Sequence, residues 1–176
     1  MFEEAFPFIL KEEGGYVNDP KDSGGATNRG VTQSTYNAFR KSQGHDERSV
    51  QHLTKEETSK IYSAIWNSCK ASELPNGLNV LHFDFAVNAG NRQAAKILQR
   101  AAGVEDDGII GRITLAKIKS SNVEDMIHEY SELRKVFYRG LATTRPKDLK
   151  FLKGWLLRTN RATRFALSLI KKERSA

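Results

Sequence analysis

The sequence predicts a mainly α-helical protein with one small hairpin or loop segment near residues 16–31. Apolar side chains recur at helical spacing along almost all of the 176 residues, which is typical of helices that bury one face. Gly, Asp, Asn, Ser and Thr gather instead in the segment near residues 16–31, a composition typical of turns. The single cysteine, Cys69, excludes an internal disulfide framework and lies on an apolar stripe, so we expect it to be buried.

Capping and breaking residues define the helices of the first half. Gly14-Gly15 ends a first amphipathic helix. Thr32 is placed to cap a second helix, and Thr54 with Glu57 forms a capping box that opens a third. Pro75-Asn76-Gly77 then breaks the chain.

The second half continues the helical pattern. An apolar helix begins at Leu78, and helical spacing resumes past Gly90. A short helix is expected from Thr114 to Lys119, and Asn122 is placed to cap a long one. A final helix follows Pro146. No repeat or obvious linker divides the chain.

Charge is distributed unevenly around the formal net value of +7. Residues 1–88 carry 9 basic and 12 acidic side chains, whereas residues 89–176 carry 19 and 9. A basic second half is typical of proteins that bind a polyanion such as nucleic acid, an anionic membrane face or the bacterial cell wall. The alternative is that the basic residues form a solvated helix face. No run of 18 apolar residues and no basic leader is present, so we expect synthesis in the cytoplasm without membrane insertion.

The strongest chemical signal is a glutamate at the end of the first helix. Glu13 is followed at once by a polar, glycine-rich segment. A helix end can hold this carboxyl group against the core, and a protonated Glu beside a groove is the general acid that glycoside cleavage requires. The alternative is a solvated side chain beside a helix C-cap. The four histidines show no ligand-like spacing, so we expect no metal site and no cofactor.

Four blocks of the chain resemble glycoside hydrolase family 108, whose members are bacterial and phage N-acetylmuramidases, some labelled secretion activators. They occur in family order and span nearly the whole chain. The blocks are Glu13-Gly14-Gly15-Tyr16-Val17-Asn18-Asp19-Pro20 with Asp22, Gly24-Gly25-Ala26-Thr27 and Gly30-Val31-Thr32; Phe83-Asp84-Phe85-Ala86-Val87-Asn88-Ala89-Gly90; Leu98-Gln99-Arg100-Ala101 with Asp107-Gly108 and Gly111-x-x-Thr114; and Phe151-Leu152-Lys153-Gly154-Trp155-x-x-Arg158.

The resemblance implies a lysozyme-like helical fold with a catalytic region at 1–91 and a peptidoglycan-binding-like region at 92–176. It places the catalytic role on Glu13. Asp22, spaced from Glu13 as in phage-type lysozymes, is the second catalytic candidate, although this chain has Asn28 where that pattern has Thr; the alternative for Asp22 is a turn-stabilising role. The expected substrate-binding residues are Tyr16, Asn18, Asp19, Thr32, Asp84 and Asn88.

Two of these candidates have a structural alternative. Asp84 and Asn88 are four residues apart and share a helix face, so they line a cleft opposite Glu13 or form a buried polar pair that braces the hairpin. Gln99 and Asp107-Gly108 also have two interpretations: they bind the cell wall, or they stabilise a helix–loop–helix.

The implied reaction is hydrolysis of the β-1,4 bond between N-acetylmuramic acid and N-acetylglucosamine, for phage lysis or for secretion across the wall. A lytic transglycosylase acting on the same bond and a basic non-catalytic module for the wall or nucleic acid are the alternatives. The expected partner is peptidoglycan rather than nucleic acid, and the expected state is a monomer. We expect another system to release the protein to the periplasm or cell wall.

Overall fold

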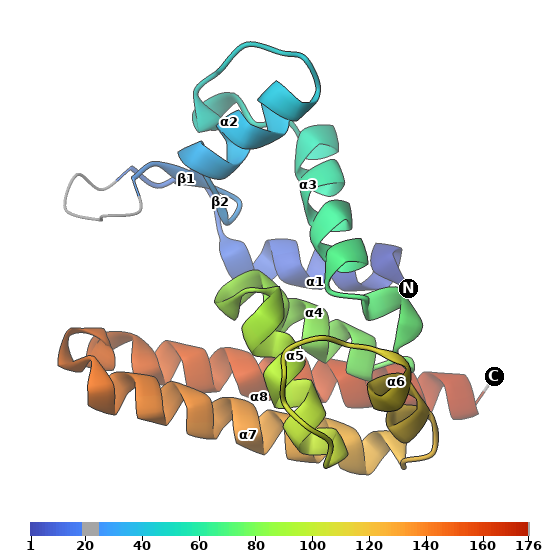
Figure 1. Cartoon of the computed structure of the whole chain (residues 1–176). Helices are drawn as coiled ribbons and strands as arrows, with labels where there is room; N and C mark the ends of the chain where they lie inside the picture. Colours follow the sequence, from blue (N-terminus) through green and yellow to red (C-terminus); the bar gives the residue numbers. More distant parts are fainter. Residues whose placement is uncertain (19–24, 176) are drawn as a thin grey trace. The chain divides into compact units, whose positions relative to one another are not determined.

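The computed structural model describes residues 1–18 and 25–175, with only the backbone at Arg174. The chain forms two compact units, Met1–Ala64 and Ile65–Ala176. The described residues form eight α-helices, three short 3₁₀ helices and one two-stranded sheet (Figure 1). The mainly α-helical prediction is therefore confirmed.

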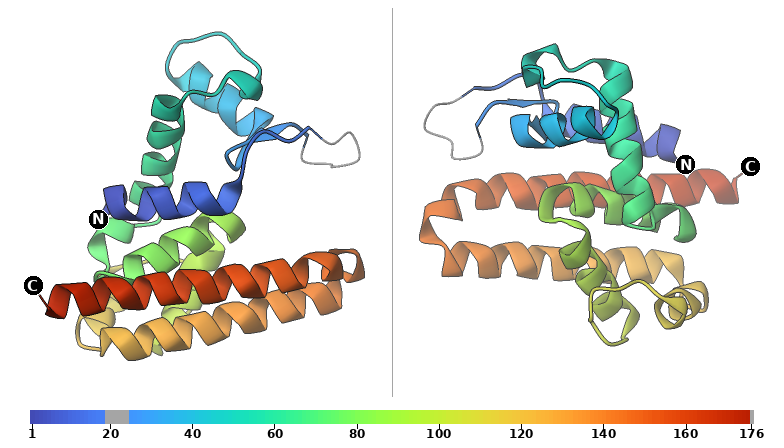
Figure 2. Two further views of the ribbon diagram at one scale, coloured as in Figure 1. Left: turned by 180° about the vertical axis from the view of Figure 1, so that it is seen from behind. Right: turned by 45° about the horizontal axis from the view of Figure 1, so that its top comes forward.

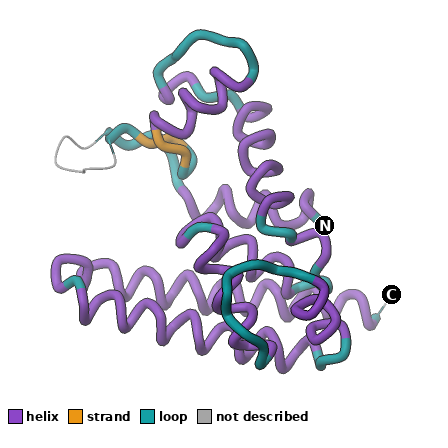
Figure 3. Tube along the Cα trace, in the orientation of Figure 1, coloured by secondary structure: helices purple, strands orange, loops and turns teal. Residues whose placement is uncertain are grey.

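The N-terminal unit contains the hairpin between two helical segments. Its elements are α1 (Phe2–Glu13), β1 (Thr27–Asn28), β2 (Val31–Thr32), α2 (Gln33–Ser42), η1 (Val50–His52) and most of α3 (Lys55–Ser68). The two short strands lie side by side (Figure 3). They pair antiparallel, with Asn28 opposite Val31. Arg29 and Gly30 form the connection with φ of 50° and 75°. Positive φ at both positions is the requirement of the tight hairpin turn whose twist matches the strands.

The expected helix caps are present in this unit. The Thr32 hydroxyl accepts a hydrogen bond from the Thr35 amide at 3.2 Å. The amide of Thr54 donates to Glu57 Oε2 at 3.0 Å, and the amide of Glu57 donates to Thr54 Oγ1 at 3.1 Å. This reciprocal pair is the predicted capping box, and it fixes where α3 begins.

Glu57 also joins α3 to α2 and to the loop that follows α2. Its carboxylate accepts hydrogen bonds from Tyr36 at 2.8 Å and from Arg40 at 3.1 Å, and it pairs with Arg48 at 2.6 Å. Partial burial acts to raise the pKa of Glu57, but the Thr54 amide, the Tyr36 hydroxyl and the Arg48 charge outweigh it and hold this pKa below its usual range. The carboxylate therefore remains charged and fixes the packing of α2.

The C-terminal unit is built around α4 and a long helical hairpin. Its elements after the end of α3 are η2 (Ala71–Glu73), α4 (Leu78–Ala89), α5 (Asn91–Ala102), α6 (Arg112–Lys119), α7 (Val123–Thr144), η3 (Pro146–Asp148) and α8 (Leu149–Arg174). Helices α7 and α8 lie side by side along their length in both views of Figure 2. The structure begins α6 at Arg112, two residues before the predicted Thr114, because extended Gly111 stands at its N-cap.

Helix α4 is buried on all sides rather than on one face. Nine of its residues, from Leu78 to Ala86, are buried, which is typical of a helix in the centre of a core. The Phe85 ring makes edge contacts with the rings of Tyr130, Phe137 and Tyr138 on α7. Aromatic packing between α4 and α7 is therefore the centre of this unit.

Two buried polar side chains belong to the same core. His82 lies 3.0 Å from the Cys69 carbonyl oxygen and 3.2 Å from the Tyr130 hydroxyl. Burial lowers the pKa of His82 from 6.5 to about 4, so the ring is neutral at pH 7. Cys69 is buried as predicted, and burial raises the pKa of its thiol to about 11.

Candidate functional site

The Glu13 carboxylate lies against the turn of the hairpin. Glu13 is the last residue of α1, and Gly14 follows it with a φ of 72°. One of its oxygens, Oε1, is buried, while the residue as a whole is half-buried. Helix α1 buries Ala5 and Ile9, and its Phe6 ring packs on the Tyr62 ring of α3 with the centroids 5.8 Å apart. The end of α1 thus holds a carboxylate at the edge of the unit.

Gly30 is the residue that permits this close approach. A Cβ atom at Gly30 would collide with Glu13 Oε2 and would lie 2.5 Å from the Tyr62 hydroxyl oxygen. That hydroxyl donates a hydrogen bond to the Arg29 carbonyl at 2.8 Å, which holds the turn in place. The Gly-Val-Thr block marks Gly30 in the sequence, but no sequence pattern indicates that Gly30 and Tyr62 meet at Glu13.

The other candidates in this unit flank a segment that the structure does not describe. Asp19 and Asp22 lie outside the described residues. Tyr16 and Asn18 precede that segment and are exposed, and Tyr16 has 41% of its surface accessible. The Thr32 hydroxyl is engaged at the N-cap of α2 and lies 3.0 Å from the Ser34 hydroxyl.

Asn28 has a structural role beside these candidates. It is buried, and its side-chain amide donates to the carbonyl oxygens of Val50 at 3.0 Å and Gln51 at 3.2 Å. These bonds fix β1 to η1 and so position the turn that contacts Glu13.

Asp84 lies in the core of the C-terminal unit. Its side chain is 0% exposed, and Arg134 Nη2 of α7 lies 2.7 Å from Oδ2. Arg158 of α8 donates to Oδ1 from Nε at 2.9 Å and from Nη2 at 2.7 Å. This geometry favours a structural role for Asp84 over contact with a glycan, because the carboxylate joins α4 to α7 and α8 and does not reach solvent.

Asn88 differs from Asp84 although the two share a helix face. Asn88 is exposed, and its amide nitrogen donates to the Asp84 carbonyl oxygen at 2.8 Å. It lines a cavity of about 420 Å³ together with aromatic side chains of α7 and α8. The two residues therefore do not form a buried polar pair.

The loop between α5 and α6 is held by Gln99. Gln99 is buried, donates to Asp107 Oδ1 at 2.7 Å and to the Ile109 carbonyl at 3.1 Å, and accepts from the Gly108 amide at 2.8 Å. Gln99 thus has its hydrogen-bonding capacity filled by the loop, which favours the structural alternative for this segment.

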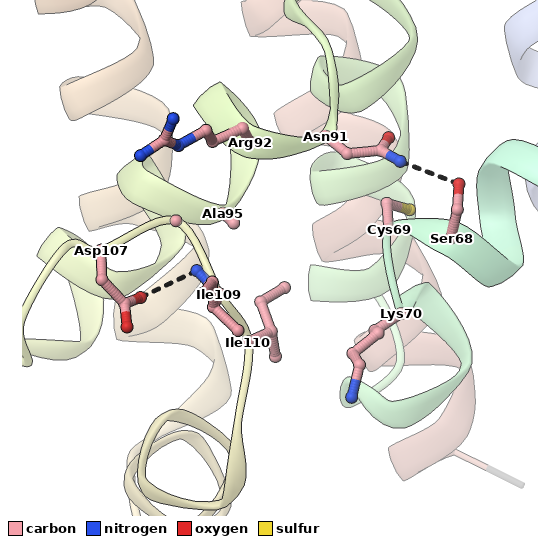
Figure 4. A pocket seen from close by; sticks show the side chains of 10 residues that line it. Ser68, Cys69, Lys70, Asn91, Arg92, Ala95, Asp107, Ile109 and Ile110 are labelled. Carbon is pink, nitrogen blue, oxygen red and sulfur yellow. Dashed lines mark hydrogen bonds between the residues drawn. The ribbon is translucent and has the colours of Figure 1, made fainter.

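A cavity of about 360 Å³ lies beside this loop and is lined by Asp107 and Gly108, but by none of the expected catalytic or substrate-binding residues. In Figure 4, Asn91 donates to the Ser68 hydroxyl at one side, and Asp107 accepts from the Ile109 amide at the other. Its basic members are Lys70, which pairs with Glu73 at 3.3 Å, and Arg92.

Two further properties concern the described part of the chain alone. Within residues 1–18 and 25–175, no group of three or more His, Cys, Asp or Glu side chains is arranged to hold a metal ion. No helix in the described part combines the length and the apolar character needed to cross a membrane.

Comparisons with known proteins agree with the order of the sequence blocks. A family model described as Glycosyl hydrolase 108 matches residues 6–90, and one described as Predicted Peptidoglycan domain matches residues 93–160. The structure is similar to that of Brucella abortus SagA, with a TM-score of 0.83 and 37% sequence identity over 96% of this chain and 94% of that one. No curated protein matches the chain.

Proposed function

The chain belongs to the glycosyl hydrolase 108 family and is a peptidoglycan hydrolase, and from this premise we propose that it is an N-acetylmuramidase. The bond cleaved is the β-1,4 linkage between N-acetylmuramic acid and N-acetylglucosamine. The observation that carries the proposal is the Glu13 carboxylate, held at the end of α1 against the Gly30 turn.

In the proposed mechanism Glu13 is the general acid. Its protonated carboxyl group donates to the glycosidic oxygen as the bond to the anomeric carbon breaks, which leaves positive charge on the sugar ring. Burial of one carboxyl oxygen supports this role, because it places the carboxyl group between the packed interior of the unit and its surface. The turn that contacts Glu13 restricts its orientation, and a fixed donor is more effective than a freely rotating one.

Asp22 is the proposed second carboxylate. It would activate the attacking water or stabilise the developing positive charge on the sugar. The support for this role is its spacing from Glu13 in the sequence. The distance between the two carboxyl groups distinguishes inversion from retention at the anomeric carbon, with about 5–5.5 Å for retention and about 6.5–9.5 Å for inversion.

Substrate contacts from Tyr16, Asn18, Asp19 and Thr32 are part of the same proposal. Exposure of Tyr16 and Asn18 supports such contacts, whereas the Thr32 hydroxyl already serves the α2 cap. The division into a catalytic region at 1–91 and a wall-binding region at 92–176 is supported by the two matched ranges. The setting we propose is the cell wall, reached with the help of another system, during either phage lysis or protein secretion.

Mass spectrometry of digested peptidoglycan tests the reaction. A muramidase releases fragments that end in a reducing N-acetylmuramic acid, one water heavier than the products of a lytic transglycosylase. The latter end in an anhydro sugar, because the muramoyl hydroxyl attacks in place of water. Reducing ends are the expected result. Anhydro ends would establish the transglycosylase alternative, and release of peptides alone would exclude both.

A further inference from the structure

A second cavity in the C-terminal unit has the chemistry of a ligand site. It has a volume of about 420 Å³ and lies where the end of α4 and the start of α5 meet the end of α7 and the start of α8. Its walls combine aromatic rings, amides and one guanidinium group, from Asn88, Gln93, Phe137, Tyr138, Arg145 and Trp155. A mainly apolar wall with a few polar groups is the usual composition of a small-ligand site.

The aromatic wall is preorganised. Trp155 stacks on Tyr138 with ring centroids 5.0 Å apart and an angle of 20° between planes, and Phe151 supports it at 5.9 Å. The Tyr138 ring packs in turn on Phe85 of the core at 5.7 Å. Trp155 nevertheless remains half-buried rather than enclosed. A rigid indole beside a cavity offers a surface for the C–H face of a sugar or for a methyl group.

Asn88 supplies an oriented hydrogen-bond acceptor at this wall. Its amide nitrogen donates to the Asp84 carbonyl at 2.8 Å, which fixes the side chain. The carbonyl oxygen of the Asn88 amide is then available for a donor on a ligand. An acetamido group carries both an N–H donor and a methyl group, so it complements Asn88 and the aromatic wall together.

The electrostatics of the cavity favour a negatively charged ligand. Arg145 is exposed at the rim, and no ion pair of its side chain is found in the part of the chain that the structure describes. Beneath the wall, the guanidinium of Arg134 lies 5.6 Å from the centre of the Tyr138 ring. Arg134 and Arg158 both contact the Asp84 carboxylate, which links α4 to α7 and α8 behind this wall. The exposed guanidinium of Arg145 attracts anions to the cavity.

We propose that this cavity binds the muramoyl-peptide portion of peptidoglycan, with the acetamido group at Asn88 and Trp155 and a peptide carboxylate at Arg145. The inference rests on the proposed function in taking peptidoglycan as the ligand. The muramoyl peptide joins an acetamido sugar to a chain that bears carboxylates, and the cavity contains a partner for each part. The cavity in Figure 4 is less suitable, because it has no aromatic wall and its Lys70 already pairs with Glu73.

The two tryptophans allow a direct binding experiment on the full chain. Trp155 lies at the cavity, whereas Trp66 is buried against Phe83 at 5.2 Å and serves as an internal control. We would record the two indole N–H signals by NMR, assign them with Trp155→Phe, and titrate with N-acetylmuramoyl dipeptide. The Trp155 signal is expected to shift and saturate while the Trp66 signal stays in place.

Charge variants test the predicted carboxylate contact. Arg145→Gln is expected to weaken binding of the dipeptide about tenfold, as loss of a charge-assisted hydrogen bond predicts. Arg139→Gln removes an exposed charge of α7 outside the cavity and is expected to leave the affinity unchanged. Chitotetraose, which has acetamido groups but no carboxylate, is expected to bind about tenfold more weakly than the dipeptide to the original protein.

Three outcomes would overturn the inference: no shift of the Trp155 signal, equal weakening by the two arginine variants, or chitotetraose binding as tight as that of the dipeptide. The dipeptide contains no bond between two sugars, so the protein cannot hydrolyse it. An unmoved Trp155 signal in a protein that still digests walls would therefore refute this site alone. Binding by a protein that releases no glycan fragments would refute the proposed function instead.

Discussion

Glu13 and Asp84 are both carboxylates in helices, but their surroundings suit them to different tasks. Glu13 ends α1 and lies against the Gly30 turn, half-buried. Asp84 lies within α4, is 0% exposed and faces the guanidinium groups of Arg134 and Arg158. Contact with two buried guanidinium groups suits Asp84 to a structural ion pair. A partly buried carboxyl group at a helix end can instead exchange a proton with a substrate.

The comparison is tested most strongly by removing the proposed acid. Glu13→Gln keeps the shape of the side chain but cannot donate the proton, so hydrolysis of purified walls should fall by about 10³-fold or more. The midpoint of thermal unfolding should stay nearly constant. Glu12→Gln is the matched control one residue earlier and should retain activity. If the two variants exchanged these results, the catalytic role would belong to Glu12.

The opposite pattern is expected for Asp84→Asn. This change removes the negative charge that faces the guanidinium groups of Arg134 and Arg158, and it should lower the free energy of unfolding by about 4 kcal/mol. Urea unfolding measures the loss. Activity per folded molecule should change much less than in Glu13→Gln. A stable Asp84→Asn protein that had lost activity would return Asp84 to the list of substrate-binding residues.

The buried His82 predicts how the stability of the C-terminal unit depends on pH. Its pKa is about 4 in the folded protein and 6.5 when unfolded, so between these values only the unfolded chain takes up the proton. The neutral ring makes its full contribution to the free energy of unfolding above pH 6.5. This contribution falls by about 3 kcal/mol as the pH drops toward 4. Urea unfolding at several pH values measures this loss. His82→Gln should flatten the dependence across this range, and an unchanged slope would mean that other groups cause it.

Asp22→Asn distinguishes chemistry from turn formation. If Asp22 activates water or stabilises the developing charge, kcat should fall about 10²-fold with little change in the unfolding temperature. If Asp22 instead stabilises a turn, the unfolding temperature should fall while the folded fraction keeps its activity. Glu47→Gln, which removes an exposed carboxylate of the N-terminal unit that has no proposed role, is the control for a general loss of negative charge.

Gly30→Ala tests whether the hairpin turn positions Glu13. Alanine at a positive φ costs about 1–2 kcal/mol, and at Gly30 the added Cβ would also collide with the Glu13 carboxylate. Gly44 has a similar φ of 73° with no atom near the position of a Cβ. Gly44→Ala should therefore lose only the cost of positive φ, Gly30→Ala should lose more stability, and only Gly30→Ala should lose wall hydrolysis. Full activity of Gly30→Ala would show that the turn does not position Glu13.

The sequence by itself determined the helical class, the caps and the family. Capping is local, since Thr54 and Glu57 are three residues apart and meet whenever α3 forms. Helical periodicity likewise depends on neighbours within two turns. The family blocks are runs of adjacent residues, so the sequence alone indicates the peptidoglycan substrate class and makes Glu13 the catalytic candidate.

Only the tertiary structure decided which side chains meet across the fold. Asp84 is 50 residues from Arg134 and 74 from Arg158, and Gly30 reaches Tyr62 and Glu13 through the packing of α1, the hairpin and α3. Nothing in the local pattern separates buried Asp84 from exposed Asn88 on the same helix face. That difference arises because α7 and α8 cover Asp84, whereas Asn88 lies beside a cavity.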